Sequence, residues 1–245
     1  MILILETIGR LPPPLGNRLR IRRRAGANRR ALASNGRERE TKARNRNEGG
    51  QRMNIAILGA GGFLGRKIAT KLAQTGTLGG KPITRLTLFD LNEPPPLDAP
   101  FPLARIAGDI VALPEAAIPS GTDVIFHLAA VVRAQAEADY NLGRRVNLRG
   151  TDAVVDACRR VVDAGGRPPR VVFTSSVASF SGGQTANLAD DARQLPANSY
   201  GAQKAAAELI LADASRRGFM DAAFRMVAAP CPRKSVRFHH SLPPR

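Results

Sequence analysis

A glycine-rich loop between an apolar run and a helical pattern constrains the fold more than any other feature of this chain. Residues 54–58 are short and apolar and end at Gly59, as a buried parallel strand does. Residues 63–74 then place an apolar side chain at every fourth position, which predicts an amphipathic helix. A strand, a tight glycine turn and a helix together form the first part of a βαβ unit.

The same alternation continues along the middle of the chain. Strands are predicted at 86–90, 105–109, 123–128 and 170–174, and helices at 147–162 and 200–217. Strands that alternate with helices indicate parallel βαβ units. We therefore expect an α/β fold with a doubly wound parallel sheet, a Rossmann-like NAD(P)-binding domain over residues 53–226.

The basic charge of the chain lies at its ends. Of the net charge of +17, residues 1–52 carry +10 and residues 219–245 carry +4. The first segment has no periodicity and is expected to be a disordered basic extension. It could be a nucleic-acid arm, an organellar transit peptide, or upstream sequence translated from too early a start. One serine, four glutamates and no aromatic residue argue against the first two, which favours Met53 as the physiological start.

The glycines and a following acid predict a dinucleotide site. Gly59, Gly62 and Gly65 would let backbone N–H groups approach a pyrophosphate at a helix N-terminus. Asp90 ends the second predicted strand, where an acid can bind the ribose hydroxyls and repel the 2′-phosphate of NADP, so NAD is the predicted cofactor. The alternatives are incidental glycines in a tight turn and an aspartate that caps a turn.

A tyrosine and a lysine four residues apart predict acid–base chemistry. Tyr200 and Lys204 share one face of a predicted helix. A phenol with a pKa of about 10 is a poor base at neutral pH, but a neighbouring ammonium favours the phenolate. Ser176 ends the fifth predicted strand and could bind the reacting oxygen. The alternative is a Tyr–Lys pair on a solvated helix face.

Four segments, at 53–67, 86–91, 127–132 and 211–219, resemble the extended short-chain dehydrogenases/reductases. That group includes NAD-dependent sugar epimerases and dehydratases, and the segments are most similar to its D-erythronate dehydrogenases. The resemblance implies NAD-dependent oxidation of a hydroxyl on a small sugar acid. The alternatives are a nucleotide-sugar epimerase or dehydratase and an NAD-binding fragment without activity. A nucleic-acid binder is the least favoured of these alternatives.

The resemblance also implies roles for individual residues. Ser176, Tyr200 and Lys204 would be catalytic, with Ser175 a rival for the serine position. His127 would be structural. The implied cofactor contacts include Tyr200, Lys204 and residues on several loops: Gly59, Gly62, Phe63, Leu64, Gly65, Asp90, Asp109 and Ile110 (beside the adenine), Leu128, Ala129, Ala130, Asn147 and Ser175.

The resemblance ends near residue 226. Residues 227–245 are basic, interrupted by prolines and aperiodic, where the family has a further strand and a substrate-binding lobe. We therefore expect an irregular basic tail that results from a truncation or frameshift, and a fold that is truncated at its C-terminus.

Other features limit the classes of partner. Cys158 and Cys231 have no metal or redox spacing, which suggests a cytoplasmic protein. No apolar run approaches the ~20 residues that span a bilayer. His239 and His240 have no accompanying carboxylates or cysteines, so no metal is expected. The predicted partners are a small-molecule substrate and a second copy in a homodimer, with no nucleic acid and no membrane.

Overall fold

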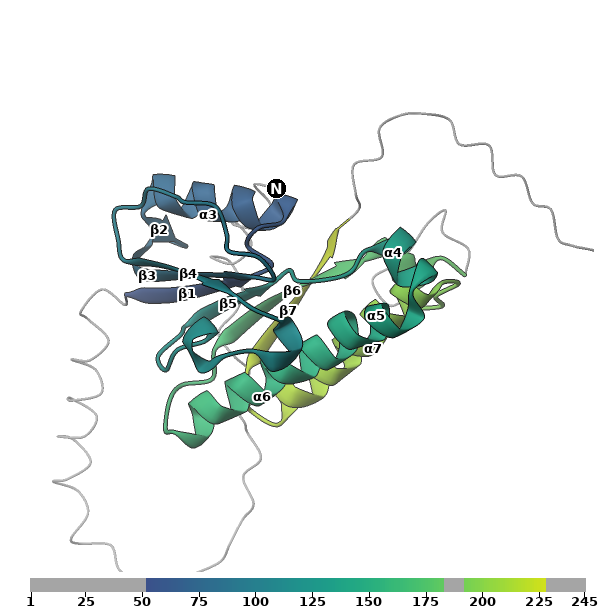
Figure 1. Ribbon diagram of the computed structural model, residues 1–245. Coiled ribbons are helices and arrows are strands. Elements are labelled where there is room, and N and C mark those ends of the chain that lie inside the picture. Colours follow the sequence, from purple (N-terminus) through teal and green to yellow (C-terminus); the bar gives the residue numbers. More distant parts are fainter. Residues whose placement is uncertain (1–51, 183–191, 228–245) are drawn as a thin grey trace, which may run out of the picture.

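The computed structural model describes residues 52–182 and 192–227, and one sheet dominates this part of the chain (Figure 1). Six strands run parallel, in the order β4 (Leu103–Ala107), β3 (Lys81–Asp90), β1 (Met53–Leu58), β5 (Val124–His127), β6 (Arg170–Ser176) and β7 (Asp221–Val227). The short β2 (Thr77–Leu78) pairs antiparallel with the start of β3.

Helices cover both faces of the sheet. The helix α3 (Phe63–Thr75) lies on one face, and α6 (Gly150–Asp163) and α7 (Ser199–Arg216) lie side by side on the other (Figure 1). The short helices α4 (Arg133–Ala138) and α5 (Tyr140–Arg144) precede a π-helical segment, Arg145–Arg149, that leads into α6. Single 3₁₀ turns stand at Ile110–Ala112, Glu115–Ala117 and Val177–Phe180.

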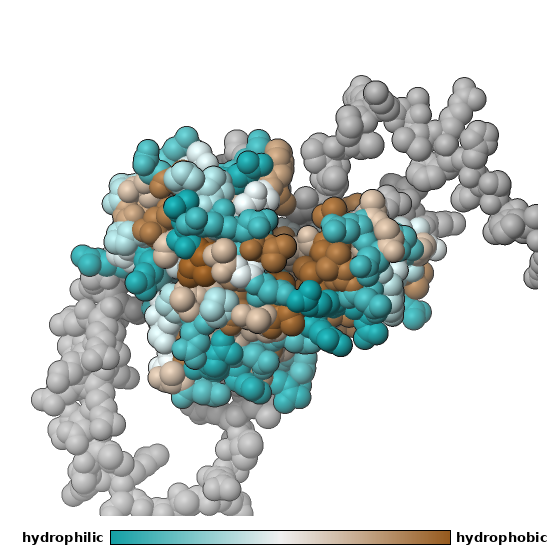
Figure 2. Space-filling model, in the orientation of Figure 1, coloured by the Kyte–Doolittle hydropathy of each residue, from teal (hydrophilic) through white to brown (hydrophobic). Residues whose placement is uncertain are grey.

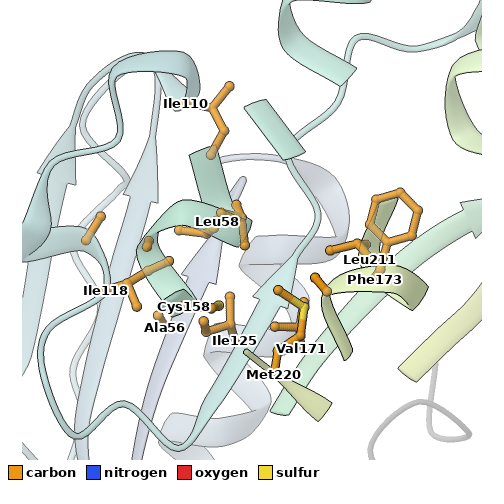
Figure 3. Packing of buried hydrophobic residues seen from close by; sticks show 14 of the residues in the cluster. Ala56, Leu58, Ile110, Ile118, Ile125, Cys158, Val171, Phe173, Leu211 and Met220 are labelled. Atoms are coloured by element: carbon orange, nitrogen blue, oxygen red, sulfur yellow. The ribbon is translucent and has the colours of Figure 1, made fainter. Parts of the chain in front are cut away.

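The alternation of side chains along β1 builds two hydrophobic cores. Ile55 and Ile57 pack in the cluster beneath α3, whereas Ala56 and Leu58 pack in the cluster beneath α6 and α7. Figure 3 shows the second cluster, in which Leu211 of α7 lies beside Phe173 of β6. Because residues 55–58 are buried and meet one helix layer or the other, this part of β1 is continuously apolar rather than alternating.

The strand order reverses at β1, and a parallel sheet of this kind forms its ligand crevice at the carboxyl ends of the strands around that point. The chain moves outward from β1 through β3 to β4, and then returns to β5 on the other side of β1. In open parallel sheets, ligands bind at this switch point. Figure 2 shows apolar residues gathered on this face between the part that contains α3 and the part that contains α4 and α5.

The predicted fold class is confirmed, with differences at individual elements. The predicted strand 105–109 lies two residues earlier, at β4, and Asp109 caps the 3₁₀ turn that follows. The structure adds β2, β7, α4 and α5, which the sequence patterns did not indicate. Val227 ends β7 rather than beginning an irregular tail. The remainder of the predicted extension and tail, apart from Arg52, lies outside the described residues.

Candidate active site

The glycine loop is packed so closely that two of its glycines have no room for a side chain. Gly59 has a φ of +89°, and a Cβ on it would lie 2.6 Å from the backbone nitrogen of Ala129. A Cβ on Gly65 would lie 2.2 Å from the carbonyl oxygen of Gly59. Gly62 caps α3 without a side-chain hydrogen bond, so no capping side chain occupies the first N–H groups of the helix. This cradle fits a pyrophosphate.

Asp90 lies against the same loop. Its Oδ2 accepts a hydrogen bond from the backbone N–H of Gly61 at 2.7 Å, and its Oδ1 accepts one from Leu91 at 2.7 Å. The carboxylate is therefore held at the end of β3, beside the loop, in the place where an acid binds ribose hydroxyls. Phe63, a predicted cofactor contact, has an exposed apolar side chain, and so does Leu91, which follows Asp90.

The other predicted cofactor contacts border the same crevice or the core behind it. Leu128 donates its backbone N–H to Leu58 at 2.8 Å, which brings the chain after β5 against the glycine loop. Leu64, Ala129 and Ala130 are half-buried. Asp109 caps a 3₁₀ turn and forms an ion pair with Arg145. Ile110 is buried against Gly150 and belongs to the core cluster (Figure 3), and its predicted contact with adenine stays a prediction.

The structure brings Tyr200, Lys204 and Ser176 together. The Nζ of Lys204 lies 5.9 Å from the centre of the Tyr200 ring and donates to the carbonyl oxygen of Thr174 at 2.9 Å. Burial raises the pKa of Tyr200, and a hydrogen bond with Ser176 opposes that rise. Burial lowers the pKa of Lys204 to about 8, against the opposing effect of Glu208. The lysine is therefore mostly protonated at neutral pH.

The two adjacent serines face different partners. Ser175 donates its hydroxyl to the carboxylate of Glu208 on α7. Ser176 accepts a hydrogen bond from the backbone N–H of Ala178 at 3.2 Å, and its hydroxyl lies at the Tyr200 phenol. Of the two, Ser176 is therefore placed to share a substrate oxygen with Tyr200.

Asn147 is buried in the π-helical segment before α6. Its Oδ1 accepts the backbone N–H of Val131 at 2.9 Å, and its Nδ2 donates to the carbonyl of Val131 at 3.0 Å. The same amide donates to Oε1 of Gln203 on α7 at 2.7 Å. Asn147 thus ties the chain after β5 to the helix that carries Tyr200, and π-helical segments often mark such functional positions.

A model of the NAD-dependent epimerase/dehydratase family matches residues 55–233. The chain belongs to the NAD-dependent epimerase/dehydratase family. The glycine cradle and Asp90 lie inside the matched region, and so do the three predicted catalytic residues.

Curated members of the family cover most of this chain but extend beyond it. The D-erythronate dehydrogenase of Cupriavidus necator is 46% identical over 175 residues, which are 69% of this chain and 52% of the relative. The D-erythronate dehydrogenase of Haemophilus influenzae is 36% identical over the same shares. This chain therefore spans about half the length of the curated relatives it matches.

A solved structure from the family shows the same fold. The nucleoside-diphosphate-sugar epimerase from Agrobacterium tumefaciens superimposes with a TM-score of 0.69 at 36% identity. The match covers 89% of this chain and 60% of that one.

His127 is structural, as predicted. It is 1% exposed, and its Nε2 pairs with the hydroxyl of Thr151 at 3.1 Å. Burial, with a contribution from the positive charge of Lys204, lowers the pKa of His127 to about 3. The ring is therefore neutral at neutral pH, and it packs against Phe173 as a core side chain.

Two residues of α7 that touch this site escaped the sequence analysis. Glu208 binds Ser175 and Gln194, and Gln203 binds Asn147. The spacing of Glu208 could have indicated its place at the site, because it follows Lys204 by one helical turn and so lies on the same face of α7. Gln203 carried no such signal, since its partner is distant in sequence.

A surface hollow of about 680 Å³ lies between α5 and α7, on the other side of α7 from the Tyr200–Lys204 pair. Ser199, Ala202 and Gln203 line it from α7, and Tyr140 and Arg144 line it from α5. It is therefore separate from the three predicted catalytic side chains.

The described ranges, 52–182 and 192–227, contain neither a metal-binding cluster nor a membrane-spanning helix. No three His, Cys, Asp or Glu side chains gather there as a metal site would require. No helix in that part of the chain has the length and apolar character needed to cross a bilayer. His239 and His240 lie outside these ranges.

Proposed function

We propose that this chain is an NAD-dependent dehydrogenase that oxidises a hydroxyl group on a small sugar acid of the D-erythronate type. The observation that carries the proposal is the meeting of Tyr200, Lys204 and Ser176 beside a glycine cradle that has no room for side chains. The 46% identity to a D-erythronate dehydrogenase supports the substrate class.

The cofactor is NAD, which the residues of the crevice fit. Gly59, Gly62 and Gly65 would hold its pyrophosphate, and Asp90 its adenosine ribose. When bound, NAD supplies the acceptor for the hydride that leaves the substrate carbon.

The chain's own residues would handle the proton. Tyr200, as the phenolate, would take the hydroxyl proton, and Ser176 would hold the substrate oxygen by a hydrogen bond. Since burial alone raises the pKa of Tyr200, the phenolate needs a nearby positive charge. Lys204 supplies this charge from 5.9 Å and is itself fixed by the Thr174 carbonyl.

The proposal is tested by offering the full-length chain NAD with D-erythronate and other small hydroxy acids, and separately nucleotide sugars. We expect NADH formation with the acids. Tyr200→Phe should lower turnover by at least ~10²-fold while NADH still binds. NADH binding is followed by cofactor fluorescence, which no tryptophan of this chain obscures. Tyr140→Phe, which changes the other, exposed tyrosine, is the matched control.

Two results would replace the proposal. Turnover of nucleotide sugars alone would favour an epimerase or dehydratase, and the similar A. tumefaciens structure is named a nucleoside-diphosphate-sugar epimerase. NADH binding without turnover of any compound would indicate a nucleotide-binding fragment. A cytoplasmic location and a homodimer belong to the same proposal, and fractionation of the source cells and sedimentation of the purified chain would test them.

A further inference from the structure

Glu208 joins three parts of the structure at the edge of the predicted site. It lies on α7, one turn after Lys204. One carboxylate oxygen accepts a hydrogen bond from the hydroxyl of Ser175 at the end of β6. The other accepts a hydrogen bond from Nε2 of Gln194 at 3.0 Å. Gln194 belongs to the segment that leads into α7. The carboxylate therefore connects the strand, the helix and the approach to Tyr200.

Lys204 is buried, and its hydrogen-bond partner carries no negative charge. The side chain is 2% exposed, and its ammonium donates a hydrogen bond to the neutral carbonyl of Thr174. The nearby ring of Phe173, 4.4 Å away, offers a weaker attraction. A buried ammonium without a countercharge is costly and tends to lose its proton.

The titratable groups around Lys204 come from two elements. On β5, His127 is neutral and contributes no countercharge. On α7, Tyr200 is protonated at neutral pH in the protein alone, because burial raises its pKa. Glu208 is the remaining acid, and its charge raises the pKa of Lys204 against the effect of burial. The β6 residues that meet the lysine, Phe173 and Thr174, carry no charge.

The same carboxylate binds one of the two serines at the end of β6. Ser175 donates its hydroxyl to Glu208 on α7. Because the hydroxyl proton of Ser175 is donated to Glu208, this hydroxyl does not donate to a substrate oxygen. Ser176 is left beside Tyr200.

We propose that Glu208, held in place by its hydrogen bonds with Ser175 and Gln194, is a positioning residue that supplies the countercharge for the Lys204 ammonium one helical turn away. The catalytic importance of this role rests on the proposed function. The contacts themselves belong to the folded chain and can be tested without turnover.

The test is an NMR titration of the side-chain carbon next to the Lys204 amine, assigned with a Lys204→Met variant. Glu208→Gln should lower the pKa of Lys204 from about 8 by at least ~1 unit. Ser175→Ala removes one hydrogen bond and leaves the charge, so the pKa of Lys204 should stay in place. An unchanged value in Glu208→Gln, or an equal fall in Ser175→Ala, would overturn the proposal.

A second measurement covers the case in which Glu208→Gln does not fold. The substitution is then made in the Lys204→Met background, where no buried ammonium needs a countercharge. Recovery of cooperative unfolding in the double variant supports the pairing, and failure in both backgrounds shows that Glu208 acts only on the fold. If the unaltered chain has no turnover, the proposed function fails while the titration still reports on Glu208.

Discussion

Lys204 is a buried charge whose position favours chemistry over stability under the proposed function. The side chain is 2% exposed, and desolvation lowers its pKa to about 8. Its ammonium lies 5.9 Å from the centre of the Tyr200 ring and is fixed by the Thr174 carbonyl. A buried charge placed beside a half-buried tyrosine is typical of a site in which proton affinity is tuned.

At Asp90, one carboxylate should decide between the two nicotinamide cofactors. Asp90→Asn keeps an oxygen that can accept the Gly61 N–H but removes the charge that would repel a 2′-phosphate. We expect the preference for NADH over NADPH to fall by about 10-fold, as measured by fluorescence titration with each cofactor.

The control for that measurement is Glu93→Gln, which removes a nearby exposed acid that pairs with Arg105. The preference should not change in this variant. An Asp90→Asn protein that discriminates as strongly as the original would show that shape, rather than charge, selects the cofactor.

The first strand, loop and helix form the element on which the site depends. A Cβ on Gly59 would overlap the backbone of Ala129, and a Cβ on Gly65 would overlap the Gly59 carbonyl, so β1, α3 and the chain after β5 meet without room for a side chain at either glycine. This close approach explains why the loop was readable from sequence, since only glycine is compatible with it.

Gly65→Ala should disrupt this element. The added Cβ would lie 2.2 Å from the Gly59 carbonyl oxygen, so α3 must move away from β1. We expect the free energy of unfolding in urea to fall by about 1–3 kcal/mol, with a loss of NADH binding.

Gly62→Ala is the matched control for stability. Its Cβ would make an ordinary contact at 3.4 Å with the same oxygen, at a φ of −72°. Its free energy of unfolding should change by no more than about 0.5 kcal/mol. Equal losses in the two variants would mean that the loop is less tightly packed than the structure indicates.

Elements with strong local patterns were predicted well, and those that depend on distant partners were not. The strand 54–58, the helix 63–74 and the strand 170–174 are confirmed by β1, α3 and β6. The strand β7 was not predicted because its sequence is neither clearly apolar nor clearly alternating, and it forms by pairing with β6, which is distant in sequence. The helix predicted at 147–162 begins at Gly150, because Asn147 is drawn into a π-helical turn by Val131 and Gln203.

At the scale of the whole molecule, the sheet order creates the site. Gly59, Asp90, Leu128 and Ser176 come from four strands of the sheet, and parallel pairing brings their carboxyl ends to one edge. The chain that forms this edge spans about half the length of its curated relatives.

Acid should destabilise the whole domain through His127. Its pKa is about 3 in the folded protein against an ordinary value of 6.5, so the unfolded chain binds a proton that the folded chain excludes. Stability from this group is present above pH 6.5 and is lost as the pH falls toward 3. Between pH 7 and pH 5 the loss should be about 2 kcal/mol.

Urea unfolding at the two pH values, for the original chain and for His127→Asn, measures this loss. Asparagine can still bond to Thr151 but does not titrate in this range, so its stability should fall by less between the two pH values. Parallel losses in the two proteins would show that other groups control the acid sensitivity.

The sequence by itself determined the fold class, the glycine loop and the identity of the Tyr200–Lys204 pair. These features arise from neighbours in the chain, where strand and helix periods and the steric freedom of glycine act locally. Only the tertiary structure decided that Ser175 turns to Glu208 while Ser176 meets Tyr200, and that Asn147 bonds to Gln203. Such pairings join residues many positions apart, and they exist only once the sheet and α7 have packed together.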